Sequence, residues 1–415
     1  MSQTDSEANR AIPITDPYEF DLSLLADPQN TYPTFAFLHS AGKQVATRGG
    51  IHVVCGYELA NQLLRDRKYL SGPIADLYRQ SLPPGAARDE LAHRINFLDP
   101  PDHPRVQRLI MRAFTSRRVG EMRPWVEAQT EACLNGLEEQ FASARAPIDI
   151  RAEFAHKIPS LVISEMLGVP VEDRDTLTEW TEAVTPLLSW QIDPESLKRG
   201  LDAAEMFAAY AADLVDKRRK TPGDDLLTAM LHAEDGEDTL TREELLSLIV
   251  TLYSAGHRTT RDLFTNGLFT LLQHPDDYAA IAAEPALVCS AVREFLRFET
   301  PTLYVVRIPA AEVVLDGARI APNTPVVVLL AAANRDPDIF TEPHRFDIRR
   351  DEASSLSFAV GPHRCLGAAL AQMEAEVMLA AVTRRWPDLA LAGDQPRWWS
   401  TGPFRGLTHL GVKPS

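Results

Sequence analysis

The sequence turns on one stretch near its C-terminal end, Phe358-Ala359-Val360-Gly361-Pro362-His363-Arg364-Cys365-Leu366-Gly367. A single cysteine lies between a turn that contains a glycine and an alanine- and leucine-rich segment. That segment, 366–385, predicts a buried helix that ends before Pro387. At a helix N-terminus the dipole and the free backbone N–H groups stabilise an anion and lower a thiol pKa. The pattern therefore indicates one thiolate presented to one metal centre.

Three interpretations of Cys365 compete. A lone cysteine is most often a buried structural residue. A zinc site would use the nearby His363, but no second cysteine or histidine pair has zinc spacing, because Cys55, Cys133 and Cys289 are scattered singly. The third is a thiolate ligand of haem iron, which favours O–O cleavage, and the rest of the sequence supports it.

A second informative segment lies over 241–273, where apolar residues on nearly all sides predict one long helix through the core. Its centre reads Ala255-Gly256-His257-Arg258-Thr259-Thr260. Gly256 weakens the helix, and the Thr259 hydroxyl can donate to the carbonyl of Ala255 four residues earlier. Such a distortion opens a groove for a small ligand beside a hydroxyl group, although a simple packing notch has the same pattern.

Together the two segments resemble the cytochrome P450 family. The residues that match its haem-binding signature are Phe358, Gly361, His363, Cys365 and Gly367, while Ala359 replaces a glycine common in that family. The resemblance extends from about residue 17 almost to the C-terminus. It implies one haem-thiolate domain over 17–415, preceded by a disordered N-terminal tail over 1–16.

The resemblance implies a mainly α fold with a small β-rich lobe, the cytochrome P450 fold. Short β-branched stretches predict strands at 44–46, 51–54, 313–315 and 326–330. Haem b would lie between the helix that follows Cys365 and the helix over 241–273, with Cys365 as the iron ligand.

Six further positions are implied to bind the haem. They are His103, Arg307, His363, Phe358, Gly361 and Gly367. The two histidines and the arginine would hold the propionates, the phenylalanine would shield the sulfur, and the glycines would leave room for a tight turn and a flat ligand. The family commonly has an arginine at the position of Gln107, and a glutamine donates without the charge-assisted bidentate contact.

The resemblance assigns Thr259 to oxygen activation, with one departure beside it. The family usually has an acid immediately before this threonine, whereas this chain has Arg258, which cannot act as an ordinary general acid or base. Asp262 lies four residues on, so we expect an Arg258–Asp262 pair. Three explanations stay open. Asp262 or ordered water supplies protons, Arg258 anchors an anionic substrate or pairs at the surface, or the reaction does not need efficient O–O cleavage.

Two further sets of residues follow from the resemblance. Glu294, Arg297 and Arg345 would form a buried network that holds the cysteine loop in place. The substrate pocket would include Thr251, Ala255, Thr302 and Leu303, beneath a lid made by the irregular segment 72–94 and the turn 188–193, which contains Trp190. Each wall residue could equally be ordinary core, and such a pocket would suit a largely apolar organic molecule.

The composition, with 45% hydrophobic residues and a net charge of −16, argues against several classes of protein. The negative charge argues against nucleic acid as a partner. The sequence contains no run of about 20 apolar residues, so it predicts no membrane span. The polar N-terminus does not have the pattern of a signal peptide, and four unpaired-looking cysteines fit a reducing compartment, so we expect a cytoplasmic protein.

One basic segment stands out against this acidic background. It contains Arg105, Arg108, Arg112, Arg117 and Arg118, with no acid among them. The segment is either a solvated helix face or a docking patch for an acidic electron carrier. We predict that a ferredoxin-type donor, itself supplied by NAD(P)H, docks near the first three of these arginines.

The function that the resemblance implies is that of a bacterial-type monooxygenase, which hydroxylates a small, largely apolar substrate in secondary-metabolite biosynthesis. Arg258 keeps an alternative open, in which the iron catalyses oxidative coupling, nitration or isomerisation without net hydroxylation. A haem-binding sensor without enzymatic activity is a further alternative. The substrate itself is either free or carried on another protein.

Overall fold

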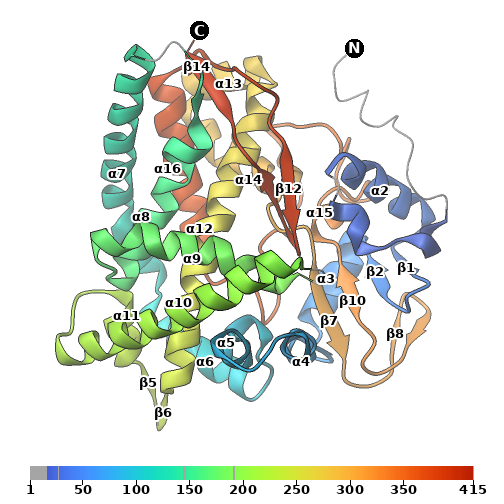
Figure 1. Ribbon diagram of the computed structural model, residues 1–415. Helices are drawn as coiled ribbons and strands as arrows, with labels where there is room; N and C mark the ends of the chain where they lie inside the picture. The colour runs from blue at the N-terminus through green and yellow to red at the C-terminus, as the bar shows by residue number, and fades with distance from the viewer. Residues whose placement is uncertain (1–15, 27, 144–145, 190–191, 415) are drawn as a thin grey trace.

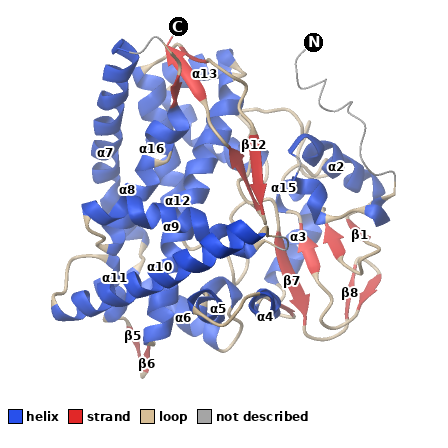
Figure 2. Cartoon of the chain, viewed as in Figure 1, coloured by secondary structure: helices blue, strands red, loops and turns tan. Residues whose placement is uncertain are grey.

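The computed structural model describes residues 16–26, 28–143, 146–189 and 192–414. Helices form a large lobe, and a smaller lobe beside it holds strands together with α2 (Pro28–Ala41) (Figure 1). Colouring by secondary structure shows the same division, with most of the helices on one side (Figure 2). The mainly α fold with a small β-rich lobe is therefore confirmed.

The predicted tail over 1–16 lies outside the described residues, except for Asp16. The carboxylate of this residue accepts a hydrogen bond from the N–H of Tyr18 and caps η1 (Pro17–Glu19). A disordered tail followed by a single domain over 17–415 stays a prediction.

The helical lobe is built from long helices joined by short turns. The α-helices that follow α2 are α3 (Tyr57–Arg65), α4 (Gly72–Ser81), α5 (Ala86–His93), α6 (Asp102–Ala113), α7 (Ser116–Ser143), α8 (Lys157–Leu167), α9 (Arg174–Val184), α10 (Pro194–Lys220), α11 (Leu226–Leu231), α12 (Arg242–Leu272), α13 (Pro275–Ala283), α14 (Val288–Phe298), α15 (Leu330–Ala333) and α16 (Ala368–Arg385). The shorter turns are η2 (Leu22–Ala26), η3 (Ile95–Phe97), η4 (Arg151–Ala155), η5 (Val171–Asp173), η6 (Thr185–Leu188) and η7 (Pro285–Leu287).

The helix α12 runs through the middle of this lobe and packs against α8, α10, α14 and α16 (Figure 1). It begins with a capping box, because the Thr241 hydroxyl accepts from the Glu244 N–H while the Glu244 carboxylate accepts from the Thr241 N–H. Buried residues occupy all of its sides, as expected for a helix that crosses a core. The helix predicted over 241–273 is confirmed.

The β-rich lobe centres on a five-stranded sheet in the order β1-β2-β10-β7-β3. Its strands are β1 (Gln44–Ala46), β2 (His52–Val54), β10 (Val326–Val328), β7 (Val305–Pro309) and β3 (Tyr69–Leu70). The β2–β10 pair is parallel and the other pairs are antiparallel. Three of the four predicted strands are β1, β2 and β10, and the fourth is β8 (Val313–Leu315), which pairs with β9 (Ala318–Ile320).

Smaller strand pairs complete the fold. They are β11 (Leu389–Leu391), β14 (Gly411–Pro414) and β4 (Ile148–Asp149) in one sheet, with the hairpins β5 (Glu234–Asp235)–β6 (Asp238–Thr239) and β12 (Trp398–Thr401)–β13 (Phe404–Leu407). The last hairpin reaches the side of α12. No helix in the described part of the chain is long and apolar enough to cross a membrane.

Candidate active site

A cavity of about 400 Å³ lies between the middle of α12, the cysteine loop 358–367 and the start of α16. Such a volume suits a small organic ligand or a cofactor. The predicted site residues that line it are His103, Thr251, Ala255, Arg258, Thr259, Thr302, Arg307, Phe358, His363, Cys365 and Gly367. The fold therefore brings residues from most of the chain to one place.

The cysteine loop is held by its own backbone. The Cys365 N–H donates to the Phe358 carbonyl at 2.9 Å, which closes the loop. Gly361 has a φ of +77°, and a Cβ there would lie 2.3 Å from the carbonyl oxygen of Leu64, so glycine is required. Ala359 has a φ of 51°, the left-handed region that disfavours a residue with a Cβ. The helix α16 begins at Ala368, slightly later than predicted.

The surroundings of the thiol differ from the prediction. Burial raises the pKa of the Cys365 thiol, whereas a hydrogen bond from the Gly367 N–H and the charge of Arg364 lower it, and burial dominates. The N–H at the start of the helix lowers this pKa as predicted, but in the protein alone burial outweighs it and the net shift is upward. A bound metal ion changes this balance, because a coordinating thiol is deprotonated outright.

Three basic side chains meet at the same end of the cavity. The rings of His103 and His363 have centroids 4.1 Å apart, and the buried Nδ1 of His363 has no hydrogen-bond partner. Burial lowers the pKa of Arg307 to about 10, and burial with the nearby charge of Arg307 lowers the pKa of His363 to about 2. No ion pair of Arg307 is found in the described ranges, and the nearby Asp99 carboxylate accepts instead from the N–H groups of Ser71 and Gly72, so the donors at this end are available to an anionic ligand.

These residues fit a flat, doubly anionic group such as haem. Gly367 faces open space, because a Cβ at this position would meet no atom within 4 Å. Gln107 does not reach towards the basic cluster but donates from Nε2 to the Pro362 carbonyl at 2.9 Å. This glutamine therefore braces the cysteine loop, a role that the sequence did not reveal.

A second part of the cavity wall is the middle of α12. The Thr259 hydroxyl donates to the carbonyl oxygen of Ala255 at 2.5 Å, as predicted. Gly256 lets Ile163 of α8 approach closely, since a Cβ would lie 3.3 Å from the Ile163 Cδ1. One cavity thus has the sulfur of Cys365 on one wall and a threonine hydroxyl on the other.

This arrangement agrees with the comparisons. The family model for Cytochrome P450 matches residues 46–396. The chain belongs to the cytochrome P450 family. It is similar to the cytochrome P450 monooxygenase PikC of Streptomyces venezuelae, with 36% identity over 421 residues that cover 100% of this chain and 97% of that protein. It is also similar to 6-deoxyerythronolide B hydroxylase of Saccharopolyspora erythraea, with 36% identity over 87% of this chain and 89% of that protein.

A solved structure gives the same result. This chain matches P450BioI, solved in complex with an acyl carrier protein that carries hexadec-9Z-enoic acid, with a TM-score of 0.85 and 30% identity. The match covers 93% of this chain and 99% of that one. The protein is a cytochrome P450 monooxygenase, and membership of the family implies haem.

The P450 has an unexpected arrangement around Arg258. Asp262 pairs with the neighbouring Arg261, at 2.9 Å from Nε to Oδ1 and 3.1 Å from Nη2 to Oδ2. The nearest acid of Arg258 is Glu182 on α9, 3.8 Å from Nη1 to Oε2. Arg258 also stacks on Trp399 of β12, 4.0 Å from the ring centroid. The predicted Arg258–Asp262 pair is therefore wrong, because the side chain of Asp262 bonds to the adjacent arginine.

Asp262 is also badly placed for proton delivery. It is 1% exposed, and it packs against β13, since a Cβ on Gly406 would lie 2.7 Å from its Cγ. It does not line the cavity. The prediction that Asp262 supplies protons is not supported by its position.

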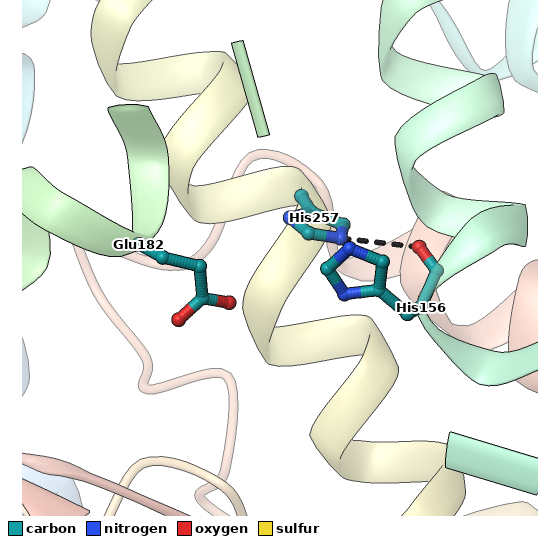
Figure 3. Close-up of side chains that lie close together, drawn as sticks. All are labelled: His156, Glu182 and His257. Atoms are coloured by element: carbon teal, nitrogen blue, oxygen red, sulfur yellow. Dashed lines mark hydrogen bonds between the residues drawn. The ribbon is translucent and has the colours of Figure 1, made fainter. Parts of the chain in front are cut away.

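A cluster of metal-compatible groups lies behind Arg258. His156, Glu182 and His257 have donor atoms within 4.8 Å of one another (Figure 3). However, a nitrogen of Arg261, Nη1, bonds to Glu182 and lies 3.4 Å from the Nδ1 of His156. The guanidinium group already supplies the positive charge that a metal ion would bring, so the cluster is an Arg–Glu–His network rather than a metal site.

The buried network that was predicted to hold the cysteine loop differs from the prediction in one residue. Glu294 and Arg297 form two hydrogen bonds of 2.7 Å. The third cation is Arg350, whose Nε lies 3.5 Å from the Glu294 Oε2. The side chain of Arg345 is 59% exposed and pairs with Glu342 and Asp347, so its predicted membership is wrong. Only its carbonyl takes part, by accepting from Arg297.

This network reaches the cysteine loop through backbone and amide contacts. Arg297 donates to the Asn334 carbonyl at 3.1 Å, and the Asn334 side chain donates to the Ser357 hydroxyl at 2.8 Å. Leu356 in turn donates its N–H to the Asn334 Oδ1 at 2.6 Å. The buried ion pairs therefore position the segment that leads into the loop.

The predicted substrate walls are partly present. Thr251, Ala255 and Thr302 line the cavity, but Leu303 does not, because it is 1% exposed and packs in the core of the β-rich lobe. The segment 72–94 is mostly helical, as α4 and α5, rather than irregular. Trp190 lies outside the described residues. Apolar lining residues that the sequence did not single out are Ile74, Phe97, Val184, Leu252 and Phe404.

The basic segment is largely engaged within the chain. Arg105 forms an ion pair with Glu244, and its side chain is 21% exposed. Arg108 lies 3.5 Å from Asp238, and Arg112 donates to the carbonyl of Glu234. These partners come from α12 and the β5–β6 hairpin, which lie far along the sequence. The segment itself contains no acids, but groups from other parts of the chain engage its arginines.

Proposed function

We propose that this P450 hydroxylates a small, largely apolar organic substrate with electrons from a ferredoxin-type donor, in secondary-metabolite biosynthesis. The observation that carries the proposal is that Cys365, from the cysteine loop, and Thr259, from α12, line one mostly apolar cavity. The names of the relatives above, 6-deoxyerythronolide B hydroxylase among them, support the biosynthetic setting by analogy.

The residues of the cysteine side would hold the haem. Cys365 would supply the thiolate ligand, and His103, Arg307 and His363 would bind the propionates. Phe358, Gly361 and Gly367 would shape the face against which the ring lies. The haem, when bound, supplies the oxygen chemistry, and the protein supplies binding, orientation and electrostatics.

On α12, the Thr259 hydroxyl would bind the water that supplies protons. Because its hydroxyl donates to the Ala255 carbonyl, its lone pairs are available to accept a hydrogen bond from water in the cavity. Arg258 cannot exchange protons at ordinary pH, and Asp262 is turned away. We therefore assign proton supply to ordered water held at Thr259.

The electron donor would approach the cysteine side of the molecule. Arg108 and Arg112 have partners in the β5–β6 hairpin but are exposed on α6, whereas Arg105 is mostly covered and engaged by Glu244. Steering by opposite charge predicts that the rate of reduction falls as ionic strength rises. A rate that does not depend on salt would argue against docking at this face.

The experiment that tests the function is turnover under labelled dioxygen. The ferric protein is first titrated with candidate metabolites, and compounds that shift the haem spin state are taken into turnover. Labelled oxygen in a hydroxylated product supports the proposal. A product without label supports the alternative that Arg258 motivates, which is coupling, nitration or isomerisation.

A carrier-bound substrate is the second candidate, because P450BioI was solved with an acyl carrier protein. If no free compound shifts the spin state but the same acyl group on a carrier protein does, the carrier-bound form is the substrate.

A further inference from the structure

Arg258 is a buried cation at the wall of an apolar cavity. The residue is 7% exposed and lines the cavity between Ala255 and Thr259. Its buried Nε has no hydrogen-bond partner among the described residues, and its ion pair, from Nη1 to the Glu182 Oε2 at 3.8 Å, is longer than a hydrogen bond. A buried charged donor without a hydrogen bond is costly, so an unsatisfied guanidinium group at a cavity wall indicates a ligand.

The charges around Arg258 compensate its own charge only in part. The groups that act on it are two carboxylates, Glu182 and Asp262, and two other guanidinium groups, Arg261 and Arg151. Asp262 is bound by Arg261, and Glu182 is closer to Arg261 than to Arg258. Both carboxylates are thus engaged mainly by Arg261, and Arg258 keeps one ion pair, to Glu182 at 3.8 Å, that is longer than a hydrogen bond.

The guanidinium group is held in a fixed orientation. The indole of Trp399 covers it at 4.0 Å, and the indole N–H is itself bound to the Leu407 carbonyl at 3.1 Å. A stacked guanidinium keeps its N–H edge available for a partner in its plane, which is the geometry that binds a carboxylate with two hydrogen bonds.

The other walls of the cavity restrict the kind of molecule that could carry a carboxylate to Arg258. Its other walls include Ile74, Phe97, Val184 and Phe404, which favour an apolar body. Arg94 also lines the cavity, but Glu90 binds its Nε with both oxygens at 3.0 Å. Arg307, His103 and His363 lie at the cysteine side and are taken up by the haem proposal.

We infer that the substrate of this P450 is an organic acid with an apolar body, whose carboxylate is bound by Arg258. The inference rests on the proposed function, since it names the substrate class of the same cavity. It also accounts for an arginine at the position where the family usually has an acid.

The test compares acids with their neutral counterparts in the haem-loaded protein. The probes are dodecanoic acid and naphthylacetic acid, each with its methyl ester, and binding is measured by the haem spin state and by calorimetry. We expect each acid that binds to have an affinity at least about tenfold higher than that of its ester, because its carboxylate forms charge-assisted hydrogen bonds with Arg258. In Arg258→Gln this preference disappears while the affinity for the ester is unchanged.

Two further variants separate ligand binding from a structural role. Glu182→Gln removes the acid that competes for Arg258, so acid binding strengthens severalfold while ester binding does not change. Arg258→Lys keeps the charge without the planar edge and retains part of the preference. Thermal unfolding of each variant shows whether it is folded.

The inference is overturned if neither acid binds, if acid and ester bind alike, or if Arg258→Gln weakens both equally. The proposed function fails separately, because it requires the carbon monoxide spectrum of a thiolate-bound haem and labelled product. A protein with that spectrum and with turnover of a neutral substrate, but without preference for acids, refutes only the role of Arg258.

Discussion

The two walls of the cavity differ in how far along the chain their contacts reach. The cysteine wall is held within one short loop, by the bond from Cys365 to Phe358 and by the φ of Gly361. On the α12 wall, Arg258 depends on Glu182 of α9 and Trp399 of β12. The turn that presents Cys365 is thus closed by contiguous residues and braced from outside by Gln107, whereas the charged contacts of the second wall are assembled by the fold. The predictions below break or sharpen this contrast.

The largest effect is expected at Cys365, on the wall that local sequence encodes. Cys365→Ala removes the only sulfur at the cavity wall in the described residues, so we expect monooxygenase activity to be abolished and the thiolate-type carbon monoxide spectrum to be lost. Cys289→Ala, at an exposed cysteine, is the matched control and leaves both unchanged. A thiolate-type spectrum in Cys365→Ala would mean that another residue binds the iron.

The next prediction concerns the buried ion pairs of Glu294, which position the segment that leads into the cysteine loop. Glu294→Gln leaves the buried guanidinium group of Arg297 without its carboxylate and Arg350 with Glu352 alone, so we expect a loss of about 3–5 kcal/mol in the free energy of unfolding by urea. Arg345→Ala, at an exposed side chain, costs no more than about 0.5 kcal/mol. Equal losses in the two variants would restore Arg345 to the network.

On the α12 wall, Thr259→Ala tests proton management. We expect product formation to fall about a hundredfold, because the hydroxyl that holds a proton donor is removed, while NAD(P)H is still consumed. Thr259→Ser keeps the hydroxyl and retains most of the activity. If Thr259→Ala matched the native protein, protons would have to arrive by another route.

The network behind Arg258 predicts a pH dependence. Burial and then the charge of Arg261 lower the pKa of His156 to about 4 from 6.5. The unfolded chain therefore binds a proton at a higher pH than the folded chain does, and the free energy of unfolding falls as pH is lowered from about 6.5 to 4. His156→Gln reduces this slope in thermal unfolding, whereas His232→Gln, at an exposed histidine, does not. If the native protein and His156→Gln had the same dependence of stability on pH, the pKa of His156 would not be lowered in the folded state.

The smallest effect concerns Ala359, where the family commonly has glycine. Its φ of 51° is unfavourable for alanine, so Ala359→Gly stabilises the protein by about 0.5–1 kcal/mol, after the entropy of the unfolded glycine is subtracted. The same substitution inside α16, Ala380→Gly, costs about 1 kcal/mol. Destabilisation at both positions would show that the loop prefers alanine.

The predictions that succeeded rest on local patterns. The helix over 241–273, the strands β1, β2, β8 and β10, and the hydrogen bond from Thr259 to Ala255 involve residues close in sequence. Those that failed depend on contacts between residues distant in the sequence or on packing. Asp262 was expected to bind Arg258 but binds Arg261, Arg345 was expected in the network that contains Arg350, and Leu303 was expected at the cavity but lies in the core.

The sequence by itself determined the family, the long helix through the core and the loop that presents Cys365. Turn geometry, helix periodicity and backbone hydrogen bonds depend on residues within a few positions of one another, and these can be read directly from the chain. Only the tertiary structure decided which charges meet. Long side chains such as Arg258, Arg261 and Arg105 reach whichever carboxylate the packing brings near, and Glu182 and Glu244 come from helices distant in sequence. Electrostatic partners act across space, so the residues that select a substrate appear only when the chain is folded.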